Sequence, residues 1–190
     1  MIGFYNYTVI LTYLSVVSAV LGMIEAMKGN FTWAILCLML SGVCDAFDGA
    51  VARTKKNRTK EEKLFGIQID SLCDVISFGV FPAVLFYFRG LNGLLGTAIV
   101  VIYCLCAVIR LGFFNVLEAK RQETEGGSNK VYRGLPVTSS SIIFPIVYVV
   151  GKMAFSEGVF VILLHIVMAL TAFFFVLDIP IKKPHLLRQR

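Results

Sequence analysis

The sequence predicts an all-α membrane protein with six transmembrane helices in one bundle. Hydrophobic residues make up 57% of the chain, charged residues make up only 16%, and the mean hydropathy is +0.79. A soluble domain carries a larger share of charge. Four runs, 8–24, 90–109, 134–151 and 158–177, contain no Asp, Glu, Lys or Arg. A bilayer span needs about 20 mostly apolar residues, so each run is long enough to lie within a spanning helix.

We expect the helices at about 8–27, 31–54, 66–88, 91–114, 135–152 and 157–178. Short polar or glycine-containing stretches separate them, and the two charged breaks fall at 53–63 and 115–133. There is no internal repeat and no low-complexity tract, so residues 1–190 predict a single membrane domain. No basic region precedes the first apolar run, and a signal peptide is therefore not expected.

Lysine and arginine are divided unevenly between the two sides of this predicted bundle. Fifteen lie in the loop after the second helix, in and after the fourth helix, and in the C-terminal tail, whereas three, Lys28, Arg89 and Lys152, lie on the other side. The positive-inside rule then places both termini and both large loops in the cytoplasm. Basic cytoplasmic loops explain the net charge of +6 without a nucleic-acid partner.

Four aspartates stand in or beside apolar runs of the second and third helices. The uncharged runs 31–44 and 75–88 have only 14 residues each, so neither helix spans the bilayer without including its aspartates. On the second helix one face is formed by Asp45, Asp48, Gly49, Ala52 and Arg53, and on the third by Gly66, Asp70 and Asp74. Both faces reach the cytoplasmic interface at the same depth.

Placing these carboxylates near the bilayer core requires a compensating charge. One charged side chain at the centre of a membrane helix costs about 2.5–3.5 kcal/mol. Carboxylate oxygens are the ligands of hard cations such as Mg²⁺, Mn²⁺ or Ca²⁺, and four of them suffice for a two-ion site that clamps phosphoryl groups. An ion pathway in a small divalent-cation or solute transporter is the alternative from another functional class.

The segments "DAFDGAVAR" and "GIQIDSLCD" resemble the signature D-x-x-D-G-x-x-A-R … G-x-x-x-D-x-x-x-D of the CDP-alcohol phosphatidyltransferases. The spacer between the two halves is twelve residues, 54–65, instead of the usual eight. The further segments "IDSLCDVISFGVFPA", "IRLGFFNV" and "YRGLPVT" are similar to elements of the phosphatidylserine synthases of this family. The resemblance covers the second to fifth helices.

The resemblance implies transfer of a phosphatidyl group from CDP-diacylglycerol to L-serine, with release of CMP, in a membrane homodimer. It implies that Asp45, Asp48, Asp70 and Asp74 hold two Mg²⁺ or Mn²⁺ ions and that Asp74 also acts as general base. The nucleotide and its diphosphate would lie against Gly49, Ala52, Arg53 and Gly66. Arg110, Asn115 and Arg133 are the candidate residues for binding the acceptor.

Two other readings bear on the acceptor and the chemistry. Another enzyme of the same family would use glycerol 3-phosphate or an inositol phosphate, and the S-F-G-x-x-P run at residues 77–82 favours serine instead. A phospholipase-D-like mechanism needs paired His-x-Lys motifs, but neither His165 nor His185 has a lysine two residues later. We expect His165 to be a buried, neutral histidine.

Overall fold

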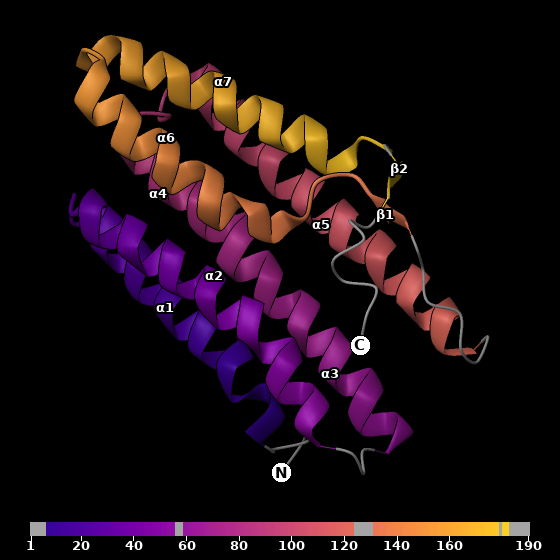
Figure 1. Ribbon diagram of the computed structural model, residues 1–190. Coiled ribbons are helices and arrows are strands. Elements are labelled where there is room, and N and C mark those ends of the chain that lie inside the picture. The colour runs from indigo at the N-terminus through magenta and orange to yellow at the C-terminus, as the bar shows by residue number, and fades with distance from the viewer. Residues whose placement is uncertain (1–6, 56–58, 124–130, 179, 183–190) are drawn as a thin grey trace.

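The protein is described by a computed structural model, which defines residues 7–55, 59–123, 131–178 and 180–182 (Figure 1). Within these residues, six helical stretches are long and apolar enough to cross a membrane: Ile10–Met27, Phe31–Ala52, Glu61–Arg89, Leu94–Ala119, Val137–Ala154 and Glu157–Val176. The predicted all-α fold with six membrane spans is therefore confirmed.

The elements follow one another in simple up-and-down order. They are η1 (Tyr7–Val9), α1 (Ile10–Met27), α2 (Phe31–Thr54), α3 (Lys60–Asp74), the π-helical segment η2 (Val75–Val80), α4 (Phe81–Arg89), α5 (Leu94–Glu123), β1 (Val131–Arg133), η3 (Val137–Ser139), α6 (Ser140–Ala154), α7 (Glu157–Val176) and β2 (Pro180–Lys182). The helix α1 packs along α2, and α5 packs along α7 (Figure 1). The continuous rod formed by α3, η2 and α4 contacts α1, α2 and α5.

The third helix begins at Lys60, six residues before the expected start at residue 66. Its start is fixed by a capping box, in which the Thr59 hydroxyl accepts from the Glu62 amide at 3.1 Å and the Glu62 carboxylate accepts from the Thr59 amide at 3.2 Å. This pairing satisfies two backbone donors that a helix start otherwise leaves open. The expected loop 53–63 is shorter than predicted for the same reason.

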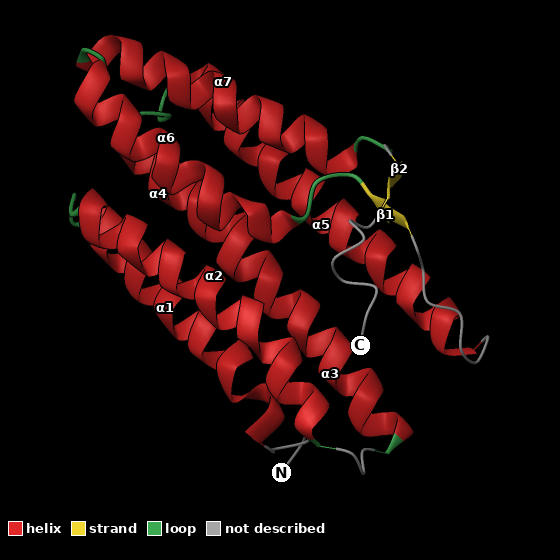
Figure 2. Ribbon diagram, in the orientation of Figure 1, coloured by secondary structure: helices red, strands yellow, loops and turns green. Residues whose placement is uncertain are grey.

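The fourth predicted helix was also wrong at its end, because α5 continues to Glu123 instead of ending at residue 114. The extension "NVLEAKRQE" is rich in strong helix formers, which carry the helix out of the apolar layer without a break. A second feature absent from the prediction is a two-stranded antiparallel sheet, β1 with β2, which pairs Tyr132 with Ile181 (Figure 2).

A π-helical turn, η2, follows Asp74 directly and contains Ser77, Phe78 and Gly79. The carbonyl of Phe78 accepts from the Tyr103 hydroxyl at 2.6 Å and from the Ser140 hydroxyl at 3.5 Å. A Cβ atom at Gly79 would lie 3.2 Å from that of Ala107 on α5, so the absence of a side chain lets the two helices approach closely. Single π turns inside α-helices occur frequently at functional sites.

The core is formed by aromatic and small side chains between the helices, and within it the rings of Phe144 and Phe175 pack against the buried Tyr103. Many large apolar side chains on α1, α5 and α7 are instead exposed, as expected of surfaces that face lipid. All five cysteines are free, consistent with membrane-buried thiols. His165 is half-buried, and its Nδ1 lies 2.8 Å from the Val161 carbonyl oxygen, a local contact within α7.

Candidate functional site

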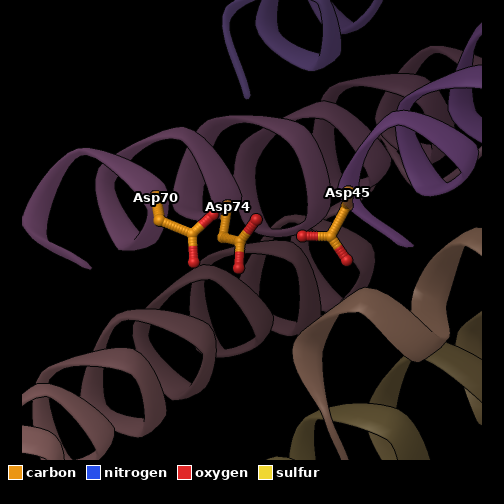
Figure 3. Close-up of side chains that lie close together, drawn as sticks. All are labelled: Asp45, Asp70 and Asp74. Carbon is orange, nitrogen blue, oxygen red and sulfur yellow. The ribbon is translucent and has the colours of Figure 1, made fainter. Parts of the chain in front are cut away.

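Three aspartates from two helices bring their carboxylates together. One oxygen each of Asp45, Asp70 and Asp74 lies within 4.8 Å of the others, and all three residues are half-buried. Figure 3 shows Asp70 and Asp74 side by side on one helix, with Asp45 reaching toward them from another. Asp70 and Asp74 share one face of α3 because they are four residues apart on the helix.

The fourth aspartate, Asp48, is only 9% exposed and lines a cavity together with Asp70. Its Oδ2 also accepts from the Thr12 hydroxyl at 3.0 Å, a contact that ties α1 to the aspartates of α2 and α3. Sequence reasoning missed Thr12, since a single hydroxyl in an uncharged helix gives no sign of its partner.

A cavity of about 140 Å³ opens beside Asp48 and Asp70, between α1, α2 and α3. The residues that line it are Val9, Thr12, Asp48, Gly49, Ala52, Lys63, Gly66, Ile67 and Asp70. Gly49, Ala52 and Gly66 were expected at a nucleotide site, and all three line this cavity together with Asp48 and Asp70, the first two from α2 and the third from α3. Lys63, Ile67 and Val9 were not expected there.

Arg53, the other expected nucleotide contact, lies in the last turn of α2, and its side chain is outside the described residues. Arg133, expected at the acceptor site, forms part of β1, and its side chain is likewise outside the described residues.

Arg110 does not line the cavity that contains Asp48 and Asp70. Its Nη1 donates to the Phe175 carbonyl at 3.3 Å and its Nη2 to the Gly134 carbonyl at 3.4 Å. Gly134 has a φ of +67°, a left-handed conformation that favours glycine. A guanidinium at the last carbonyls of α7 also has favourable electrostatics, because the C-terminus of a helix carries partial negative charge. Arg110 thus joins α5 to the end of α7 and to the segment that leads into α6.

Asn115 lies next to the aspartate-bearing face of α3. Its Oδ1 accepts from the Ser71 hydroxyl at 2.6 Å, and its Nδ2 donates to Gln68 Oε1 at 3.4 Å. Ser71 directly follows Asp70, so this pair of contacts fixes α5 against the part of α3 that carries two of the carboxylates. Ser77, in the π turn, accepts from the Ser15 hydroxyl at 3.0 Å, a second link between α1 and this rod.

The arrangement can hold hard divalent cations. The donor set consists of carboxylate oxygens alone. Mg²⁺ and Mn²⁺ prefer such oxygen ligands, whereas softer metals prefer nitrogen or sulfur ligands. The clustered carboxylates would repel one another if all were charged, and a bound cation removes this repulsion. The residues therefore fit a divalent-metal site, and a cavity with Gly49 and Gly66 in its lining adjoins Asp70.

Comparison with known proteins agrees with this chemistry. The model of the CDP-alcohol phosphatidyltransferase family matches residues 5–177. The chain is 37% identical over 147 residues to the archaetidylserine synthase of Methanothermobacter thermautotrophicus, covering 75% of the chain and 57% of that protein. It is 36% identical over 117 residues to the CDP-diacylglycerol–serine O-phosphatidyltransferase of Saccharomyces cerevisiae, covering 60% and 41%.

A third relative, the CDP-diacylglycerol–serine O-phosphatidyltransferase of Helicobacter pylori strain 26695, is 30% identical over 157 residues, covering 81% of the chain and 62% of that protein. The chain thus spans roughly 41–62% of the length of these three relatives. Because the family model covers nearly all of the described membrane bundle, the chain is an integral membrane protein that belongs to the CDP-alcohol phosphatidyltransferase family.

Proposed function

We propose that this protein is a phosphatidylserine synthase, which transfers the phosphatidyl group of CDP-diacylglycerol to L-serine and releases CMP. The observation that carries the proposal is the group of three carboxylates within 4.8 Å, one of which, Asp70, also lines a cavity with glycines in its lining, in a chain of this family. The names of the relatives support serine as the acceptor.

The metal site would be formed by Asp45, Asp48, Asp70 and Asp74, with two Mg²⁺ or Mn²⁺ ions. Bound there, the ions would neutralise the diphosphate and stabilise the charge that develops on it during transfer. The chain itself contributes the orientation of the ligands. Thr12 holds one oxygen of Asp48, and the Ser71–Asn115 contact fixes the turn of α3 between Asp70 and Asp74.

The nucleotide half of the donor would lie in the 140 Å³ cavity, against Gly49, Ala52 and Gly66, with Arg53 at the diphosphate. Each small residue leaves space that a larger side chain would fill. A guanidinium can hold phosphate oxygens by two parallel hydrogen bonds, which suits Arg53 to the diphosphate.

In the transfer step, the serine hydroxyl oxygen would form a bond to the phosphorus that carries the diacylglycerol. The bond between this phosphorus and the oxygen bridging to CMP breaks, and the bridging oxygen leaves with CMP. Asp74 would accept the hydroxyl proton. General-base catalysis of this kind contributes about 10²–10⁴-fold to the rate.

The acceptor would be bound by Arg110, Asn115 and Arg133. Asn115 is supported by its position beside Ser71, next to Asp70. Arg110 is held by backbone carbonyls of Gly134 and Phe175, and a guanidinium is suited to bind the carboxylate of serine by charge-assisted hydrogen bonds.

The membrane topology and the assembly state complete the proposal. The excess of lysine and arginine on one side supports both termini and the active site at the cytoplasmic face, where CDP-activated lipid and serine meet. We further infer that residues 1–190 form one membrane domain and that the protein is a homodimer, as the family resemblance implies.

The decisive experiment is an assay of the purified full chain in detergent or lipid nanodiscs with CDP-diacylglycerol and a panel of alcohols. CMP release and a new phospholipid are expected with L-serine, and far less of either with glycerol 3-phosphate or an inositol phosphate. The CDP-activated ether lipid archaeol belongs in the same panel, because one relative is named an archaetidylserine synthase. Divalent-cation flux through proteoliposomes without CMP release would instead favour a transporter.

A further inference from the structure

The cavity beside the aspartates has two chemically different ends. Three segments of the chain line it, and each has a residue near the carboxylates and a residue further out: Thr12 on α1 and Val9 at the end of η1, Asp48 and Ala52 on α2, and Asp70 and Lys63 on α3. The inner end is therefore lined by carboxylates and a hydroxyl. The outer end is lined by the apolar Val9 of η1 and Ala52 of α2, and by Lys63 of α3.

Lys55 and Lys63 are two lysines at this end of the bundle whose side chains the structure describes, and they differ in their partners. The ion pairs of the described residues are Lys28 with Glu25, Lys55 with Glu62, and Arg89 with Glu157, and Lys63 takes part in none of them. Lys55, its neighbour across the α2–α3 connection, is engaged by Glu62 at 2.9 Å. Lys63 instead lines the cavity, next to Gly66 and Ile67.

We propose that Lys63 is a specificity-determining residue that donates hydrogen bonds to the nucleoside of the CDP-linked donor. This inference rests on the proposed function and adds a residue to its nucleotide site. A diphosphate held by cations at Asp48 and Asp70 occupies the inner end, which directs the nucleoside outward toward Ala52 and Lys63. Lys63 and Asp70 are seven residues apart on α3, about 10 Å along the helix axis at 1.5 Å per residue.

The direction of the Lys63 side chain favours the nucleoside, and not the phosphates, as its hydrogen-bonding partner. Side chains of an α-helix tilt toward its N-terminus, so Lys63 leans away from Asp70 and toward the outer end of the cavity. An ammonium has three donors and no acceptor. It therefore suits the carbonyl oxygen and unprotonated ring nitrogen of cytosine, or the ribose hydroxyls, in a region where Val9, Ala52 and Ile67 offer no side-chain polar group.

The test is equilibrium binding of CMP, CDP and inorganic pyrophosphate to the full chain in the presence of Mn²⁺. Lys63→Ala and Lys63→Met should each weaken the binding of CMP and CDP by about tenfold, the usual scale for a lost hydrogen bond to a charged group. The affinity for pyrophosphate should stay unchanged. Lys63→Arg should restore part of the affinity. Lys28→Ala, at the opposite end of the bundle, is the matched control and should bind all three ligands as the wild type does.

The variants are chosen so that folding does not confuse the result. Alanine and methionine are good helix formers, and Lys63 is outside the Thr59–Glu62 capping box. Unchanged CMP affinity in Lys63→Ala would overturn the inference. An equal loss of CMP and pyrophosphate would also overturn it, since Lys63 would then act on phosphate.

The binding assay needs no acceptor, so it separates this inference from the proposed function. If the wild type binds CMP, Lys63→Ala loses it, and serine yields no product, the inference stands while the proposed serine transfer fails. If serine transfer proceeds and Lys63→Ala binds CMP normally, the inference alone fails.

Discussion

The hydroxyl of Thr12 donates a 3.0 Å hydrogen bond to the carboxylate of Asp48, although the two residues are 36 positions apart in the chain. The bond connects the first transmembrane helix to a residue proposed as a metal ligand. Since Asp48 is almost completely buried, the hydroxyl also replaces part of the hydration that this carboxylate has lost.

Thr12→Val should therefore lower activity while the protein still folds, because valine keeps the shape of threonine and replaces its hydroxyl with a methyl group. A hydrogen bond to a charged group contributes about 1.5–3 kcal/mol, which corresponds to about a ten- to hundredfold effect if the bond orients the ligand during turnover. CMP release at a series of Mn²⁺ concentrations measures it. Thr12→Ser, which restores the hydroxyl, should recover most of the loss. Wild-type metal dependence in Thr12→Val would show that Asp48 needs no support from α1.

The proposed metal ligands give a sharper prediction. Asp45→Asn, Asp48→Asn and Asp70→Asn should each reduce CMP release by at least about a hundredfold, since even outer-shell partners of a metal ligand are worth about 10–100-fold. Activity of the wild type should vanish in excess chelator and return with Mg²⁺ or Mn²⁺. Glu25→Gln, at the C-terminal end of α1 on the opposite side of the bundle, serves as a control that changes a carboxylate outside the cluster. Full turnover in excess chelator would rule out metal assistance.

The faces of α2 and α3 could be predicted from the sequence because the aspartates and glycines repeat at helical spacing within long apolar runs. The spans were predictable for the same reason. The position of Thr12 could not be predicted, because the rotation of α1 about its own axis depends on packing against α2 and not on any charge pattern. The same limit applies to Arg110, whose contacts with Gly134 and Phe175 depend on how α5, α7 and the β1–α6 segment meet.

Two backbone features were also beyond the sequence patterns. The π turn at Val75–Val80 inserts into an apolar run that reads as ordinary helix, and its cost is offset by tertiary partners, Tyr103 and Ser140. The start of α3 was readable in principle, since Thr59 and Glu62 have the spacing of a capping box. The basic composition of 53–63 suggested a loop and outweighed that signal.

The connection between α2 and α3 provides a test of the unusual twelve-residue spacer. Deleting residues 55–58 brings it to the family's usual eight and leaves the capping box and Lys63 in place, so activity should be largely retained. The deletion removes the Lys55–Glu62 ion pair, but such partly exposed pairs contribute only about 0–1 kcal/mol. Thr59→Ala, by contrast, should lower the free energy of unfolding by about 1 kcal/mol, as expected for a lost N-cap. Thermal unfolding in detergent and CMP release measure both variants. A deletion variant that inserts and folds but no longer binds CMP would make the connection part of the nucleotide site.

Asp74→Asn separates the proposed base from the proposed ligands. The amide keeps the size of the carboxylate but cannot accept the serine proton. If Asp74 acts mainly as base, CMP binding should persist while turnover falls by about 10²–10⁴-fold, the usual contribution of general-base catalysis. If Asp74 acts mainly as a ligand, metal and nucleotide affinity should fall together with turnover. The Mn²⁺ and CMP titrations described above distinguish the two outcomes on the same preparation. Turnover within a few-fold of the wild type would exclude both roles, and the proton acceptor would then have to be sought among Asp45 and Asp70, which lie in the same carboxylate group, and Asp48, which lines the adjoining cavity.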